Sequence, residues 1–266
     1  MAGGARAMDD HAARACSWEG FFNTRDLGGL PVRGGGTTRF GAFVRAADLR
    51  FVTRSGWQQA YEAGIRTVMD LRNEDEIRPR PRPATGEAGS GQFAAGEVTA
   101  PIPPGIDHTE VPLDGIEDVA FWRDINQAGL NGTPLYYPAF LERQASRCAA
   151  VISTLAGAPP DGVLFHCAAG RDRTGLVALL LLAFAGAEPE AIATDYEMSR
   201  AAMPALFHAL GRQDEGPKAD AILARYGTTA RAAVLDVLAD FDAERYLHSA
   251  GVPAADLDAV RARLSP

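Results

Sequence analysis

A cysteine and an arginine six positions apart, in a glycine-containing loop, are the residues of this sequence best suited to chemistry. Cys167 opens the run CAAGRDRTG, and Arg173 lies near its end. The apolar segment 163–165 before the run predicts a buried strand, and the apolar segment 176–185 after it predicts a buried helix. A loop between a strand and a helix N-terminus directs several backbone N–H groups into one small volume, next to the positive end of the helix dipole. Such a loop binds a tetrahedral oxyanion.

The residue types in this loop indicate displacement at phosphorus. The planar guanidinium of Arg173 can hold two phosphate oxygens while the sulfur of Cys167 faces the phosphorus. The positive field favours the thiolate, which is the nucleophilic form, and Gly170 permits the tight curvature. We therefore expect attack by Cys167, a cysteinyl-phosphate intermediate and its hydrolysis by water, with Thr174 donating its hydroxyl to the departing sulfur. The expected phosphate-binding residues are Ala168, Ala169, Gly170, Arg171, Asp172 and Arg173.

Other interpretations of the loop compete with this one. Cys167 can be an inert buried cysteine, and the glycines can serve only a turn, although a turn does not require two arginines and an aspartate. A sulfurtransferase also begins its active loop with cysteine, but that loop is typically one residue shorter. A catalytically inactive phosphate-binding module is the remaining alternative, although such proteins usually lose the cysteine or the arginine, and both are present here.

The segment HCAAGRDRTG resembles the HCxxGKDRTG signature of bacterial tyrosine/serine phosphatases of the protein tyrosine phosphatase B type. Three weaker elements follow the family pattern in order along the chain: NTRDLGG from Asn23, DLR with Glu76, and DY with Ser199. The ending YLHSAGVPAADLDAVRARL is similar to the family's C-terminal helix pair. Two positions depart from the pattern, because Arg171 replaces the usual lysine and Thr24 replaces an aromatic residue.

This resemblance implies phosphotyrosine as a substrate, with phosphoserine, phosphothreonine and phosphoinositides as further substrates. It also implies a mobile helical cover at about 200–230, although the apolar residues there also fit ordinary C-terminal packing. Because Arg171 and Arg173 lie in one loop, we expect substrates with more than one phosphate. We expect no cofactor and no metal, since the loop itself neutralises the phosphate. The partner is therefore a phosphorylated protein or a phosphoinositide.

The donor of a proton to the leaving oxygen is expected to be Asp172, as in the similar loop of myotubularin-like lipid phosphatases. Asp70, at the end of a strand, and Asp114 are alternatives, and Asp172 can instead form an ion pair with a neighbouring arginine. Asp70 can also serve only as a cap or in a salt bridge to Arg72. The expected supporting residues are His166, Thr174, Arg25, Asp26 and Asp70. His166 either orients the loop or is a satisfied core residue, and Arg25 and Asp26 are expected to brace the loop from behind the residues that contact phosphate.

The composition is that of a globular protein. The chain has 266 residues, of which 47% are hydrophobic, and a net charge of −8, which argues against a nucleic-acid binder. Three cysteines are too few and too scattered for a disulfide framework or a zinc site. The longest apolar run has 12 residues and the N-terminus lacks a secretory signal, so we expect no stable membrane insertion and a cytoplasmic protein. Export without a signal peptide leaves no mark in the sequence, and the oligomeric state leaves none either.

Strands alternating with helices, followed by helices alone, predict an α/β fold. We expect a cysteine-phosphatase-like central mixed or parallel sheet flanked by helices, with a C-terminal helical layer or lid. The predicted strands are 65–72, 106–113 and 163–165, and the predicted helices are 54–61, 138–155, 176–185, one from Pro189, 202–210, 217–226, 231–250 and 254–264. Residues 1–16 are expected to be a flexible arm, 17–266 a single phosphatase domain, and 78–105 a Pro/Gly-rich loop insertion.

Overall fold

A five-stranded sheet forms the centre of the protein in the computed structural model, which describes residues 13–78 and 98–265. The strand order is β1-β2-β5-β3-β4, and the neighbours from β2 to β4 are parallel whereas β1 is antiparallel to β2. The strands are β1 (Arg25–Asp26), β2 (Phe43–Ala46), β3 (Ile65–Asp70), β4 (Asp107–Glu110) and β5 (Gly162–His166). The predicted α/β fold with a mixed sheet is confirmed.

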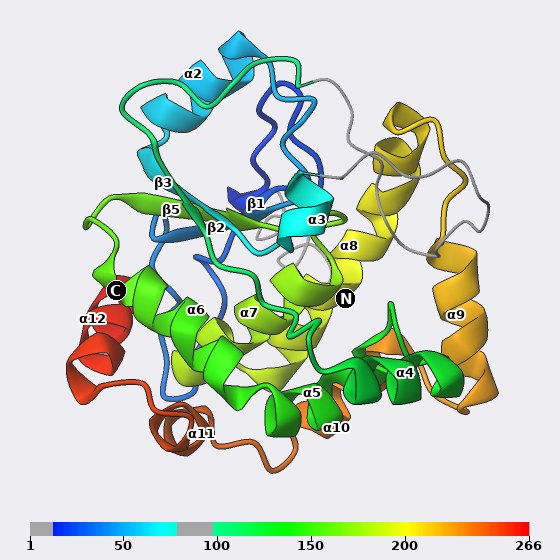
Figure 1. Ribbon diagram of the computed structural model, residues 1–266. Helices are drawn as coiled ribbons and strands as arrows, with labels where there is room; N and C mark the ends of the chain where they lie inside the picture. The colour runs from blue at the N-terminus through cyan, green and yellow to red at the C-terminus, as the bar shows by residue number, and fades with distance from the viewer. Residues whose placement is uncertain (1–12, 79–97, 266) are drawn as a thin grey trace, which may run out of the picture.

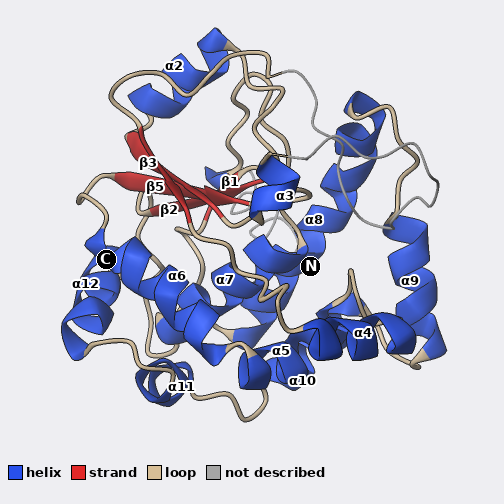
Figure 2. Ribbon diagram, in the orientation of Figure 1, coloured by secondary structure: helices blue, strands red, loops and turns tan. Residues whose placement is uncertain are grey.

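Helices cover both faces of the sheet unequally. In Figures 1 and 2, α2 lies on one side, and α5, α6, α7, α11 and α12 gather on the other. The helices that precede the cysteine loop are α2 (Arg54–Glu62), α3 (Glu74–Ile77), α4 (Val119–Ala128), the 3-10 helix η1 (Pro134–Tyr136), α5 (Tyr137–Arg143) and α6 (Ala145–Gly157). Those that follow it are α7 (Asp172–Phe184), α8 (Pro189–Ala209), α9 (Gly216–Arg225), α10 (Ala230–Leu238), α11 (Ala243–Ser249) and α12 (Ala254–Leu264). None of the helices in the described ranges is long and apolar enough to cross a bilayer.

The elements on either side of the cysteine loop are the most deeply buried. All five residues of β5 are buried between β2 and β3, and ten of the thirteen residues of α7 are buried. A helix that is apolar all round belongs in a core, as the sequence predicted for 176–185. The loop is therefore held at both ends by rigid structure.

Two helix caps predicted from the sequence are present in the structure. The Thr53 hydroxyl accepts a hydrogen bond from the Gly56 N–H at 3.0 Å and begins α2. Asn73 and Glu76 form the predicted capping box of α3, in which the Glu76 carboxylate accepts the Asn73 N–H at 3.0 Å.

Three predicted helical stretches have different boundaries in the structure. The stretch 138–155 is divided into α5 and α6, because Gln144 leaves the helical conformation at φ −112° and ψ 29°. The stretch 231–250 is divided into α10 and α11, where Asp242 accepts the Arg245 N–H at 2.9 Å and starts a new helix. Conversely, the separate helix predicted at 202–210 is the end of α8, which continues through Pro204.

The last part of the expected flexible arm at 1–16 includes a buried residue. Arg14 is 1% exposed, and its guanidinium donates to the Asp26 carbonyl at 3.0 Å and to the Asp195 carboxylate. Arg14 is therefore anchored in the packed structure, and residues 1–12 lie outside the described residues. Most of the predicted insertion, residues 79–97, also lies outside them.

Candidate active site

The cysteine loop, residues 167–173, connects β5 to the first turn of α7. The Cys167 side chain is 2% exposed and lines a cavity of about 880 Å³. Five further loop residues line the same cavity: Ala168, Ala169, Arg171, Asp172 and Arg173. The N-terminus of α7 and the Cys167 side chain thus meet in one cavity.

Gly170 is the point at which the loop turns. Its φ is +66°, and a Cβ atom there would lie 2.5 Å from the Ala46 carbonyl oxygen. Both the backbone conformation and the lack of space require glycine. This close approach seats the loop directly on the end of β2.

Arg173 is held by two acidic side chains from other parts of the chain. Its Nη1 and Nη2 atoms donate to the Glu76 carboxylate at 2.5 and 2.7 Å, and Nη1 lies 3.4 Å from Asp114 Oδ2. Although burial acts in the opposite direction, Asp114 and Glu76 raise the pKa of Arg173 well above its usual value. The guanidinium is therefore a fixed cation with a defined orientation.

The three candidate proton donors occupy different surroundings. Asp172 lines the cavity, and its carboxylate accepts hydrogen bonds from Arg171 Nε at 3.2 Å and from the Tyr196 hydroxyl at 3.3 Å. Asp114 also lines the cavity; burial raises its pKa, and its Oδ1 has no hydrogen-bond partner among the described residues. Asp70 is 1% exposed and does not line the cavity.

Asp70 and His166 form part of the support behind the loop. Arg72 donates to Asp70 at 2.6 Å; although burial opposes the effect, His166 and Arg72 lower the pKa of Asp70. His166 is 1% exposed, its Nδ1 lies 3.2 Å from the Cys167 carbonyl, and burial lowers its pKa. Thr174 is fully buried, and its hydroxyl has no partner in the part of the chain that the structure describes.

In the described ranges, Arg25 contacts the loop indirectly, through Asn23, whereas Asp26 does not. Arg25 donates to Asn23 Oδ1 at 2.7 Å and to Asp195 at 2.9 Å, and among the described residues its link to the loop runs through Asn23. The Asp26 carboxylate accepts the N–H groups of Gly28 and Gly41 at 2.7 and 2.8 Å, and it makes no hydrogen bond to the loop within the described residues. Asp26 therefore shapes the turn after β1 instead of bracing the loop.

Several residues that line the cavity were not predicted as site residues from the sequence. The walls include Glu76 together with the apolar and aromatic side chains Ile116, Trp122, Tyr136, Phe207 and Ile222. Glu76 stood within the DLR element, which was a usable signal, whereas nothing local marked Trp122 on α4. The C-terminal part of α8, the segment that follows it and the start of α9 contribute Phe207, Arg212, Glu215 and Lys218.

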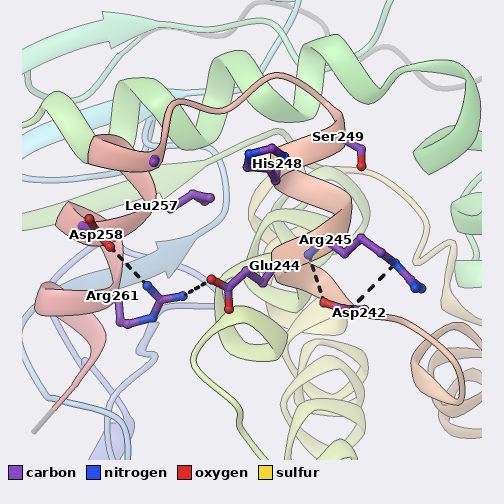
Figure 3. Close-up of a pocket in the computed structure, with 9 residues that line it drawn as sticks. Asp242, Glu244, Arg245, His248, Ser249, Leu257, Asp258 and Arg261 are labelled. Atoms are coloured by element: carbon purple, nitrogen blue, oxygen red, sulfur yellow. Dashed lines mark hydrogen bonds and ion pairs between the residues drawn. The ribbon is translucent and has the colours of Figure 1, made fainter.

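A second depression of about 380 Å³ lies between α11 and α12, and it shares no lining residue with the first (Figure 3). Its charges pair with one another, since Arg261 contacts Glu244 at 2.8 Å and Asp258 at 3.3 Å. All three side chains are more than one third exposed. The described residues also contain no cluster of three histidine, cysteine or acidic side chains that could hold a metal ion. The cavity of Cys167 is accordingly the candidate site.

Comparison with known proteins identifies the family of the chain. Residues 16–265 match the tyrosine phosphatase family. A candidate tyrosine-protein phosphatase of Cupriavidus necator is 31% identical over 175 residues, which are 65% of this chain and 59% of that protein. A tyrosine-protein phosphatase of Nostoc commune is 28% identical over 84% of this chain and 74% of its own length. The triple specificity protein phosphatase PtpB of Mycobacterium tuberculosis is 28% identical, with 70% of each chain covered. The resemblance read from the sequence is confirmed, and the chain belongs to the tyrosine phosphatase family.

Proposed function

We propose that this chain is a cysteine-dependent phosphatase that hydrolyses phosphotyrosine through a cysteinyl-phosphate intermediate. The observation that carries the proposal is the meeting of Cys167, Arg173 and the N-terminus of α7 in one cavity. The Cys167 thiolate attacks phosphorus; the S–P bond forms, the P–O bond to the substrate breaks, and its electron pair leaves with the oxygen. Water then attacks phosphorus, and the sulfur departs as thiolate while inorganic phosphate forms.

In this proposal, Arg173 and the loop amides stabilise the charge that develops on the phosphoryl oxygens. A guanidinium has five N–H donors, and Glu76 accepts two of them, so donors remain for phosphate. Glu76 thus binds the edge of the guanidinium that Nη1 and Nη2 form, and the other N–H donors of Arg173 are left for the substrate. Thr174, whose buried hydroxyl is unpartnered among the described residues, donates to the sulfur when it departs.

Asp172 is the proposed proton donor, because it lies in the first turn of α7 and lines the cavity. Asp114 is the second candidate, favoured by its raised pKa and its unpartnered Oδ1. A leaving-group series separates the two. Loss of the true donor should slow hydrolysis of phenyl phosphate by about 10²–10⁴-fold. Hydrolysis of a nitrophenyl phosphate should slow much less, because nitrophenolate leaves without a proton. We expect this selective loss for Asp172→Asn; the same pattern for Asp114→Asn instead would transfer the role.

The cavity walls support an aryl phosphate as the preferred substrate. Trp122, Tyr136 and Phe207 offer aromatic surface to a phenyl ring. Phosphoserine, phosphothreonine and phosphoinositides are proposed as further substrates, in keeping with the triple specificity named for the Mycobacterium tuberculosis relative. The expected second phosphate contact at Arg171 lacks support, because Arg171 donates to the Gly132 carbonyl at 3.0 Å and to Asp172.

The segment 200–230 is proposed as a cover over this cavity, since Phe207 and Ile222 line it from α8 and α9. Lys218, the only lysine in the sequence, also lines the cavity and offers a selective label. Acylation of Lys218, followed by peptide mass, should be slower with vanadate bound. Equal rates with and without vanadate would count against a closing cover. Residues 17–266 are proposed to form one domain, in keeping with the single sheet and the continuous family match.

Hydrolysis of phenyl phosphate in the presence of a metal chelator tests the function as a whole. We expect turnover by the wild type, inhibition by vanadate, and loss of turnover in Cys167→Ser. Phosphate binding without turnover by the reduced wild type would support an inactive binding module. Transfer of sulfur from thiosulfate to cyanide without phosphatase activity would support a sulfurtransferase.

A further inference from the structure

A buried cluster of three arginines around one carboxylate lies behind the cysteine loop. Asp195, on α8, accepts hydrogen bonds from Arg14, from Arg45 and from Arg25, the last at 2.9 Å. All four side chains are at most 3% exposed. The proposed chemistry uses none of these four side chains. The free-energy cost of removing their charges from water therefore requires another explanation.

Two side chains connect this cluster to the loop. Arg45 Nη2 donates to the Gly170 carbonyl at 2.9 Å while its Nη1 donates to Asp195. Asn23 Nδ2 donates to the same carbonyl at 2.9 Å and to the Ala169 carbonyl at 3.1 Å. Asn23 is in turn fixed by Arg25, which donates to its Oδ1 at 2.7 Å.

Holding these two carbonyls also orients two amides. In a planar trans peptide, the C=O and the following N–H point in opposite directions. When the carbonyls of Ala169 and Gly170 are drawn toward the cluster, the N–H groups of Gly170 and Arg171 are turned away from it, toward the side on which phosphate must bind. Three guanidinium groups around one carboxylate also leave positive charge behind the loop, which favours an anion in front of it.

We propose that Asp195 is a positioning residue: by holding Arg25 and Arg45 it fixes Asn23 and the Gly170 carbonyl, and so presents the loop amides to the phosphoryl group. The proposal rests on the proposed function, because it concerns the same phosphate. It also gives the DY element of the sequence a physical role that its position alone does not reveal.

The first test is Asn23→Gly. Asn23 has a φ of +52°, which glycine adopts without strain, so the substitution removes the amide bonds to the loop and keeps the backbone conformation. Because misdirected donors weaken binding of phosphate and of the transition state alike, we expect vanadate affinity and kcat/KM to fall together, by about 10- to 100-fold. Thermal unfolding should show a folded protein at the assay temperature.

Asp195→Asn is the second variant, and its vanadate affinity and kcat/KM should also fall together. If Asp195→Asn does not fold, Arg45→Lys takes its place. Arg231→Ala is the control. Arg231, on α10, pairs with Glu190 and Glu197 of α8, which is the helix that carries Asp195. None of these three residues makes a hydrogen bond or ion pair to the loop among the described residues. The vanadate affinity of Arg231→Ala should stay within about twofold of the wild type.

Unchanged vanadate affinity in folded Asn23→Gly and in the folded second variant would overturn the proposal. The same conclusion follows if Arg231→Ala loses as much affinity as they do, because the effect would then belong to α8 in general. Calorimetric binding of vanadate keeps the test separate from the proposed function. A wild type that binds vanadate without turnover refutes the phosphatase activity, and the binding comparison still decides the role of Asp195.

Discussion

The substitution Glu76→Gln tests how Arg173, the arginine proposed to bind phosphate, is oriented. Glutamine keeps the shape of the side chain and one acceptor oxygen, but it replaces the second oxygen with a donor group. Each Glu76 oxygen accepts from a different nitrogen of Arg173, at 2.5 and 2.7 Å, so in this geometry one of the two hydrogen bonds is lost. The side chains of Arg173 and Glu76 are only 13% and 10% exposed, so water does little to replace the lost bond.

The expected effect follows from this count. A hydrogen bond to a charged group contributes about 1.5–3 kcal/mol, which corresponds to about 10- to 150-fold in a rate constant. If Glu76 holds Arg173 in the conformation that binds phosphate, Glu76→Gln should lower kcat/KM for phenyl phosphate by that factor. If Glu76 instead competes with phosphate for Arg173, kcat/KM should rise, and unchanged or increased activity would refute our reasoning.

The pH dependence supplies a second readout. Although burial acts in the opposite direction, hydrogen bonds and charge from Arg173 lower the pKa of Glu76 below its usual value of 4.5. Because the pKa is lower in the folded state, the ion pair stabilises the protein above about pH 4.5, and this stability is lost as the pH falls through the folded-state pKa. The ratio of wild-type to variant kcat/KM should therefore stay constant from neutral pH to about pH 5 and shrink only in stronger acid.

Glu110→Gln is the matched control. Glu110 accepts two hydrogen bonds from Arg78, at 2.9 and 2.5 Å, but this pair does not line the cavity, and its side chains are 29% and 57% exposed. Since exposed ion pairs contribute little, kcat/KM should stay within about twofold of the wild type. A large loss in this variant would mean that the assay responds to general damage.

Two further outcomes follow from the loop. Gly170→Ala should destabilise the protein by about 1–3 kcal/mol in chemical denaturation and abolish turnover, whereas Gly211→Ala, at φ +63° with open space around it, should cost about 1 kcal/mol and leave turnover intact. Iodoacetamide should alkylate Cys167 first, because burial raises the pKa of Cys16 to about 12 and of Cys148 to about 11. Faster labelling of Cys16 or Cys148 by peptide mapping would contradict this expectation.

The parts of the fold that depend on neighbouring residues were predictable from sequence. The buried strand before Cys167, the apolar helix after it and the capping box at Asn73 each carry their signal within a few positions. The cysteine loop carries its own signal as well, because its backbone, the adjacent helix dipole and the side chains of Cys167 and Arg173 lie within a few positions of one another.

The supporting structure of the site was not predictable in the same way. Glu76 and Arg173 are 97 positions apart, and Arg45 and Asp195 are 150 positions apart. Only the packing of α3, β2 and α8 around the loop brings these charges together. Helix boundaries failed for a related reason, since α8 continues through Pro204 and the break at Gln144 falls inside a continuous hydrophobic pattern.

Direct detection of the cysteinyl-phosphate tests the central claim. The wild-type protein would be mixed with phenyl phosphate, quenched rapidly in acid, digested and analysed by mass spectrometry. We predict one phosphoryl group on Cys167 in the wild type and none in any peptide of Cys167→Ser. A wild type that turns over without phosphorylating Cys167, or a Cys167→Ser protein that keeps full activity, would contradict the proposed mechanism.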